Sequence, residues 1–196
     1  LYPYSQNNFG GFAGQLLNNF DPDVQSLSGG TVNTTNYRVG KQSYQASATA
    51  STTTTVALAS LHQDFSGYSS TDTFSLAYFI NDIRCGSIKV RLKVDASNYF
   101  EYTITPSTTS GYYVNAWAKS AFTATGSPDW AGIVSADFLI TATSGGTTTV
   151  QLDGFRVNDT DAYPDYALVS HAILGAPQTK LAGEQMDIEY LLEFDI

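Results

Sequence analysis

The stretch "SIKVRLKVDASNYFEYTI", residues 87–104, decides the fold because two alternating runs flank a short turn. Apolar side chains alternate with charged ones from Ile88 to Asp95, which is the period of a β-strand with one buried and one solvated face. The second run repeats the alternation from Tyr99 to Ile104. The intervening turn, "DASN", predicts that the two runs form an antiparallel hairpin.

The charges of this hairpin predict its register. The first run carries Lys89, Arg91 and Lys93 on its solvated face, and the second run carries Glu101 on the same face. Opposite charges that lie across a strand pair stabilise it. We therefore expect Glu101 to lie opposite the basic side chains.

Short runs of the same kind, separated by turn residues, recur along most of the chain, among them "TFSLAYFI", "YYVNAWA", "ADFLITAT" and "TTTVQLDGFRV". About ten strands at a spacing of roughly 8–12 residues are typical of a two-sheet antiparallel sandwich. The 196 residues suffice for one such domain with appendages. The sequence therefore predicts an all-β protein with a sandwich over residues 21–157.

The two ends of the chain break this rhythm. Residues 1–20 mix aromatic and polar side chains without a sustained period, so they are either an arm that orders on another surface or a first strand with an irregular lead. Residues 158–166 are polar, contain Pro164 and predict a linker. Residues 158–196 as a whole then form a linker and a C-terminal strand extension.

The final run, "MDIEYLLEFDI", has one apolar and one anionic face. Ile188, Tyr190, Leu192 and Phe194 share the apolar face. We expect these four residues to act in assembly, by completing a sheet of the extension itself or of a neighbouring subunit. The charges on the other face discourage indiscriminate edge pairing.

Composition excludes several classes of function. The chain has 18 acidic and 9 basic residues, for a net charge of −9, which argues against nucleic acid and anionic membranes as partners. No run reaches the roughly 20 apolar residues of a membrane span, so we expect no membrane insertion. The single cysteine, Cys85, permits no internal disulfide, and we interpret it as an ordinary half-buried thiol.

No motif for covalent chemistry is present. His62 and His171 are far apart and belong to no zinc or nucleophile motif, so we interpret both as structural or solvated. A pair of carboxylates of the glycosidase kind stays open, because such a pair is set by separation in space. We expect no catalytic residue and no enzymatic activity.

Three segments together resemble a known family. "GKQSYQASATAS", residues 87–104 and "GSPDWAGIVSADFLITATSGGTTTVQLDGFRV" are similar, in order and spacing, to jelly-roll modules of the carbohydrate-binding kind. The resemblance covers roughly residues 24–157. It implies an antiparallel jelly-roll β-sandwich.

The resemblance also implies a structural calcium ion between the first and last strand regions. Asp153 matches the closing-strand carboxylate, and Asp21 or Asp23 would supply the other side, although the usual early acidic motif is not clean. Calcium takes six to eight oxygen ligands. The residues alone leave three interpretations of Asp153, namely a sheet edge, a cap of the adjacent turn or a cation ligand.

Glycan binding in such modules uses aromatic rings flanked by polar groups. Here the candidates are Arg91, Tyr99 and Glu101 on the charged face, with Tyr113 and Trp117 on one face of the next run. These five residues form a single platform if that run pairs in phase. The alternative is that the aromatic side chains pack in the core or in an interface.

The segment "DYALVSHAILGAPQTKLAGEQMDIEYLLEFDI", residues 165–196, resembles C-terminal segments that follow jelly rolls in virion proteins of tailed bacteriophages. This resemblance implies a non-enzymatic structural protein of the virion surface, as a capsid decoration, tail fibre or baseplate appendage. Its partners would be copies of itself, other virion proteins and host-surface glycans.

Two alternatives stay open beside the virion protein. One is a secreted, extracellular and non-catalytic carbohydrate-binding module of a polysaccharide-degrading system. The other is a glycoside hydrolase or lyase with the same fold, which would need a carboxylate pair in a groove.

Overall fold

The computed structural model describes residues 15–21 and 26–158, and this part of the chain is built from β-strands. The strands are β1 Gln15–Asn18, β2 Leu27–Ser28, β3 Thr31–Asn33, β4 Ser43–Ala48, β5 Thr53–Leu58, β6 Thr73–Ile80, β7 Cys85–Lys93, β8 Tyr99–Ile104, β9 Gly111–Ala118, β10 Thr123–Thr125, β11 Ser135–Ala142 and β12 Thr148–Asn158. Two single-turn 3₁₀ helices, Lys119–Ala121 and Trp130–Gly132, lie between them.

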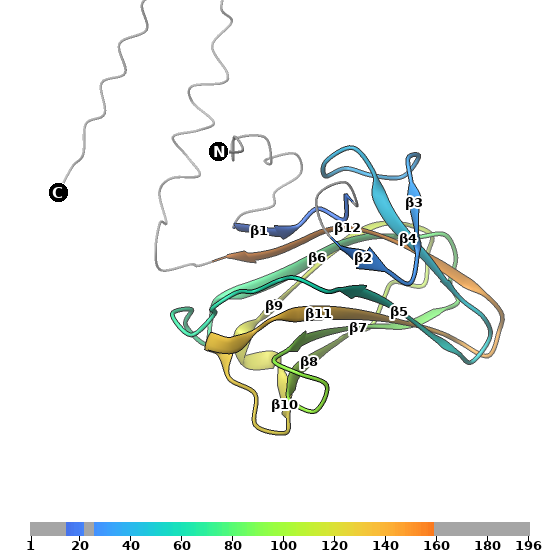
Figure 1. The fold of residues 1–196 in the computed structure, drawn as a ribbon. Helices are drawn as coiled ribbons and strands as arrows, with labels where there is room; N and C mark the ends of the chain where they lie inside the picture. The colour runs from blue at the N-terminus through green and yellow to red at the C-terminus, as the bar shows by residue number, and fades with distance from the viewer. Residues whose placement is uncertain (1–14, 22–25, 159–196) are drawn as a thin grey trace, which may run out of the picture. The chain divides into compact units, whose positions relative to one another are not determined.

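The strands form two antiparallel sheets that lie as separate layers (Figure 1). The first sheet has the order β3-β4-β12-β6-β9, and β1 pairs with the free part of β12. The second sheet has the order β10-β8-β7-β11-β5-β2. This arrangement confirms the all-β antiparallel sandwich that the alternating runs predict.

The core lies between the two sheets and follows the alternation of the sequence. In β7 the buried residues include Ile88, Val90 and Leu92, and in β11 they include Phe138 and Ile140. These residues come from the apolar positions of their runs, while the residues between them face outward. Burial of this apolar surface is the main favourable term in the stability of the sandwich.

The hairpin of residues 87–104 forms as predicted. In its register Arg91 lies opposite Glu101, and Lys89 lies opposite Thr103. The turn is closed by backbone bonds from Val94 and Asp95 to the carbonyl of Asn98. The cross-strand pairing of Glu101 with basic side chains is therefore confirmed.

Residues 15–21 belong to the sandwich. β1 pairs with β12, and Leu17 lies in the core. Phe20 is fully buried, and its ring contacts the ring of Phe138 edge to face at a centroid distance of 5.0 Å. Of the two interpretations of residues 1–20, a first strand therefore describes the part from residue 15 onward.

Several strands could not be predicted from alternation in the sequence. β2 and β10 have two and three residues, too few to show a period. β5 begins at Thr53, inside a threonine run that resembles a turn. Thr53 is held there by pairing with Thr141 of β11, with a side-chain hydrogen bond of 2.8 Å between their Oγ1 atoms.

One end of the core is filled by aromatic rings from both sheets. Phe100 of β8 stacks on Trp130 at 3.7 Å between centroids, and Tyr102 of β8 stacks on Trp117 of β9 at 4.6 Å. Contacts between aromatic rings add to the stability gained from burial alone. Much of the aromatic content of the sequence is therefore used in packing.

Replacing Phe20 tests whether residues 15–21 are part of the folded domain. Phe20→Ala should lower the free energy of unfolding by about 3–5 kcal/mol, because the change leaves a cavity beside Phe138. Ile83→Ala is the control, since Ile83 is 64% exposed, and it should change the free energy by less than about 0.5 kcal/mol. Guanidinium denaturation of the full chain measures both. Equal effects of the two substitutions would show that Phe20 is not a core residue.

Candidate functional site

The five residues predicted as a single glycan platform are divided between the two sheets. β9 pairs with β6 in the first sheet, whereas β8 pairs with β7 in the second. Trp117 is only 5% exposed and lies in the core, where Tyr113 also packs. The condition for a single platform, pairing of this run with β8, is therefore not met, because the connection after Ile104 crosses from one sheet to the other.

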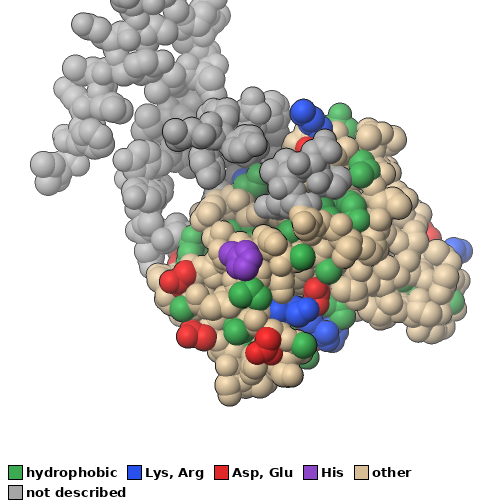
Figure 2. Space-filling model, viewed as in Figure 1, with side chains coloured by type: hydrophobic (Ala, Val, Ile, Leu, Met, Phe, Trp, Pro, Cys, Tyr) green, Lys and Arg blue, Asp and Glu red, His purple; other side chains and the backbone are tan. Residues whose placement is uncertain are grey.

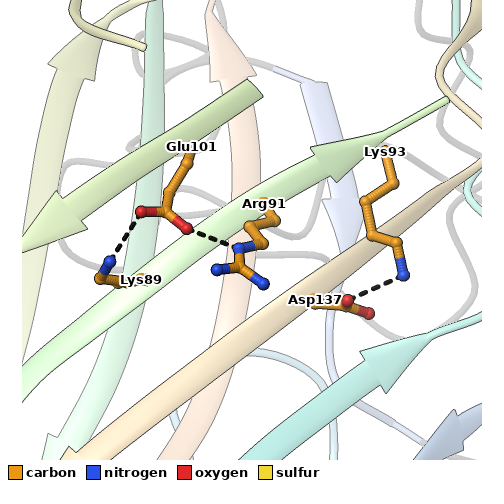
Figure 3. Close-up of polar contacts among 5 residues, drawn as sticks. All are labelled: Lys89, Arg91, Lys93, Glu101 and Asp137. Atoms are coloured by element: carbon orange, nitrogen blue, oxygen red, sulfur yellow. Dashed lines mark hydrogen bonds and ion pairs between the residues drawn. The ribbon is translucent and has the colours of Figure 1, made fainter. Parts of the chain in front are cut away.

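The outer face of the second sheet carries a network of ion pairs, which we call the charged ladder: Lys89, Arg91, Lys93, Glu101 and Asp137. Glu101 accepts hydrogen bonds from Lys89 Nζ at 2.7 Å and from Arg91 Nε at 2.5 Å. Lys93 Nζ lies 2.8 Å from Asp137 Oδ2 (Figure 3). Figure 2 shows acidic and basic side chains close together over β7 and β11.

The groups of the charged ladder satisfy one another. Burial acts to raise the pKa of Glu101, but the hydrogen bonds from Lys89 and Arg91 outweigh it, and the pKa lies below its ordinary value. The Arg91 guanidinium lies over the ring of Tyr99, 4.7 Å from its centroid. A sugar bound here would have to displace this cation or break ion pairs.

The outer face of the first sheet is organised differently. Gln45 of β4, Gln151 of β12, Phe79 of β6 and Tyr112 of β9 are successive partners in the strand register. Their chain neighbours on β4, β12 and β6 are buried in the core, so these side chains point outward. We call this set the amide–aromatic row. It crosses four strands and is about 14 Å long at the usual strand spacing.

The amides of this row are only partly satisfied. Gln45 Oε1 accepts from Gln151 Nε2 at 3.0 Å and from Asn33 Nδ2 at 2.9 Å. Gln151 is 4% exposed, and its Oε1 accepts no hydrogen bond from any residue that the structure describes. A buried acceptor without a donor costs about 1–3 kcal/mol.

A loop borders the row. Residues 34–42, which we call the strap, join β3 to β4 and reach the outer face of β12. The strap is fixed at its start, because Asn33 Oδ1 accepts from the amides of Thr35 and Asn36 at 2.9 Å each. Val39 packs on Gly154, where a Cβ would lie 3.2 Å from Val39 Cγ2. Glycine at position 154 therefore allows the strap to approach the sheet.

Asp153 holds the middle of the strap. The register of β12 shifts between Leu152 and Gly154, and this irregularity allows Asp153 to stay on the outer face. Its carboxylate accepts from the amide of Arg38 at 2.6 Å, from the amide of Val39 at 3.2 Å and from the hydroxyl of Tyr112. Burial raises the pKa of Asp153, and the three donors act in the opposite direction.

Tyr112 links the strap to the row. Burial raises the pKa of its hydroxyl, and the hydrogen bond to Asp153 raises it further. The Arg38 guanidinium lies over the ring of Tyr112, 4.4 Å from its centroid. Tyr112 is therefore kept neutral and in one orientation.

The predicted calcium site does not match this arrangement. Calcium binds oxygen atoms, but the oxygens of Asp153 face N–H and O–H donors, and Asp21 accepts from Gln42 Nε2. No group of three or more His, Cys, Asp or Glu side chains within the described ranges is placed to hold a metal ion. Asp23 lies outside the described residues. For Asp153 the contacts favour the interpretation as a cap, here of the strap.

The remaining candidates add no chemistry to these faces. His62 is exposed, and Cys85 is buried, which raises the pKa of its thiol to about 11. Ile188, Tyr190, Leu192, Phe194 and His171 lie outside the described residues. Over the part of the chain that the structure describes, we find no helix with the length and apolarity to cross a membrane.

Solved structures of carbohydrate-binding modules share this fold. A family 11 module of a cellulosomal cellulase of Clostridium thermocellum aligns with a TM-score of 0.53 at 14% sequence identity, over 76% of this chain and 96% of that chain. A family 11 module from Clostridium thermocellum in complex with a β-1,3-1,4-mixed-linked tetrasaccharide gives a TM-score of 0.51 at 16% identity, over 76% and 97% of the two chains. No protein-family model and no curated protein matches the chain. The likeness confirms the jelly-roll sandwich expected from the sequence.

The importance of Asp153 for the strap can be measured directly. Asp153→Ala should lower the free energy of unfolding by about 2–3 kcal/mol, because it removes the acceptor for the amides of Arg38 and Val39. Hydrogen exchange at those two amides should accelerate. Asp153→Asn is the matched variant, and it should lose less because an amide oxygen still accepts. The assignment fails if both amides exchange at the same rate in Asp153→Ala and in the wild type.

The charged ladder predicts how the stability of the fold depends on pH. A carboxyl with a lowered pKa stabilises the fold above its ordinary pKa, here 4.5, and this stabilisation is lost as the pH falls through the lowered value. Glu101→Gln should therefore reduce the loss of stability between about pH 5 and pH 3, by less than about 1 kcal/mol because the ion pairs are partly solvated. Urea denaturation over this range tests it. A pH profile identical to that of the wild type would contradict the role of Glu101.

Proposed function

We propose that this chain is a non-catalytic carbohydrate-binding module that holds a glycan chain on the amide–aromatic row. The observation that carries the proposal is the row itself, in which two glutamine side chains lie beside two half-buried aromatic side chains on one outer face of the sandwich. The shared fold with carbohydrate-binding modules supports the class of function.

The chemistry of the row suits a sugar. Phe79 is half-buried, so it presents part of an aromatic surface to which the C–H face of a sugar ring can pack, whereas the Tyr112 ring lies beneath the Arg38 guanidinium. Gln45 and Gln151 add neutral amide groups, the kind of side chain that hydrogen-bonds to sugar hydroxyls. An apolar surface with a few fixed polar groups is typical of small-ligand sites.

The charged ladder is the weaker candidate surface. Glu101 already accepts two strong hydrogen bonds and Asp137 accepts one. The aromatic residue of this face, Tyr99, lies beneath Arg91. Binding there would lose charge-assisted hydrogen bonds before it gained new ones. Arg91, Tyr99 and Glu101 are therefore better explained as a solvated face of the sheet.

This proposal favours the extracellular module over the bacteriophage protein. The virion hypothesis depends on residues 165–196, which lie outside the described residues, and the two solved structures named above give it no support. A separate observation would be needed to restore it, namely copurification of the chain with particles.

Glycan binding tests the proposal in two stages. An array of plant, algal and bacterial glycans should yield at least one ligand for the full chain, and calorimetry should then show that Phe79→Ala weakens binding of that ligand about tenfold or more. Tyr99→Ala is the control on the opposite sheet and should leave the affinity unchanged.

Two results would contradict the proposal. A complete lack of binding across the array would remove the function, provided that the unfolding transition shows a folded chain. Loss of binding in Tyr99→Ala with normal binding in Phe79→Ala would move the site to the charged ladder.

A further inference from the structure

Arg38 occupies a fixed position next to the amide–aromatic row. Its backbone amide donates to Asp153 Oδ2 at 2.6 Å, and its guanidinium lies 4.4 Å from the centroid of the Tyr112 ring. The strap that carries it is also held through Asn33 at its start and through Ser43 Oγ, which donates to the carbonyl of Asn36 at 2.6 Å. The cation is therefore placed before any ligand binds.

Arg38 differs from Arg91 and Arg84, the other two arginines of the described residues that are not buried. Arg91 is paired with Glu101 in the charged ladder, and Arg84 is paired with Asp82 at 3.7 Å. Arg38 forms no ion pair with any carboxylate of the described residues, and the residue is exposed. Its guanidinium can therefore donate from several N–H groups to a ligand while it stays over the ring.

The charges around Arg38 leave a local excess of positive charge in an acidic chain. The facing carboxylate is Asp153, which is fully buried and already accepts from three donors. A second carboxylate, Asp21, accepts from the strap residue Gln42. Arg156 interacts electrostatically with both Asp153 and Tyr112, and Lys41 is exposed on the same strap. The net charge of the whole chain is −9, so this cationic position runs against the overall balance.

We propose that Arg38 makes the amide–aromatic row selective for anionic glycans, in which a uronate carboxylate or a sulfate meets Arg38 beside the sugar bound on Phe79. This inference rests on the proposed function and names its ligand class. A planar guanidinium recognises carboxylate and sulfate oxygens with paired N–H donors, and the hydrogen bonds are charge-assisted. The rings and amides of the row bind the sugar, while Arg38 selects its charge.

The experiment compares glycans that differ only in charge. The probes are an oligogalacturonate with its fully methyl-esterified form, and a sulfated galactan oligosaccharide with its desulfated form. The full wild-type chain should bind at least one anionic member about tenfold more tightly than its neutral partner at low salt, and the difference should shrink as salt is added. The two pairs distinguish a carboxylate from a sulfate.

Substitutions in the strap then assign the preference to Arg38. Arg38→Gln should make the affinities for the two members of each pair equal, while the backbone bond that holds the strap to Asp153 is retained. Lys41→Gln removes the same charge from the same strap and should keep most of the preference. Matching unfolding curves for the two variants exclude a folding defect.

Three outcomes would overturn the inference. Equal binding of both members of each pair removes the selectivity but leaves the proposed function intact. A preference that survives in Arg38→Gln assigns the selection to another cation. A folded chain that binds no glycan on the array or in either pair removes the proposed function, and the inference with it.

Discussion

The outer face of the first sheet depends on one buried carboxylate. Asp153 lies in β12, the central strand of that sheet, and the residue has no exposed surface. Burying a charged group is costly unless it is hydrogen-bonded, and here the amides of Arg38 and Val39 and the hydroxyl of Tyr112 supply the bonds. The position of the strap, the orientation of Tyr112 and the placement of Arg38 all follow from those three contacts.

Polar side chains are paired differently on the two outer faces of the sandwich. In the charged ladder, cross-strand partners of opposite sign neutralise one another within the sheet. In the amide–aromatic row, neutral amides lie beside aromatic rings, and one amide oxygen is left without a described donor. The face with the clearer sequence pattern is therefore the one whose charged groups are already paired, and the face on which we propose glycan binding has the less conspicuous pattern.

The sequence predicted what depends on local period and missed what depends on distant contacts. The hairpin of residues 87–104 and the partner of Glu101 followed from alternation across one short turn. The pairing of β9 with β6 did not, because the strand that follows a hairpin can join either sheet and its own alternation is the same in both. The strap residues that bond to Asp153 are more than a hundred positions away in the sequence. The sequence therefore indicates that Asp153 needs a partner but not which residues provide it. Phe79 gave one signal, as an aromatic residue out of phase with the buried positions of "TFSLAYFI", but its neighbours Gln151 and Tyr112 come from other strands.

The position of the glycan site is tested most directly by chemical-shift mapping of the isotopically labelled full chain during titration with its best array ligand. The side-chain amides of Gln45 and Gln151 report on the amide–aromatic row, and the backbone amides of Tyr99 and Glu101 report on the charged ladder. If the glycan binds on the amide–aromatic row, the largest shifts fall on the Gln45 and Gln151 side chains and on the amides of Phe79 and Tyr112. Shifts concentrated at Tyr99 and Glu101, with the two glutamines unchanged, would contradict it.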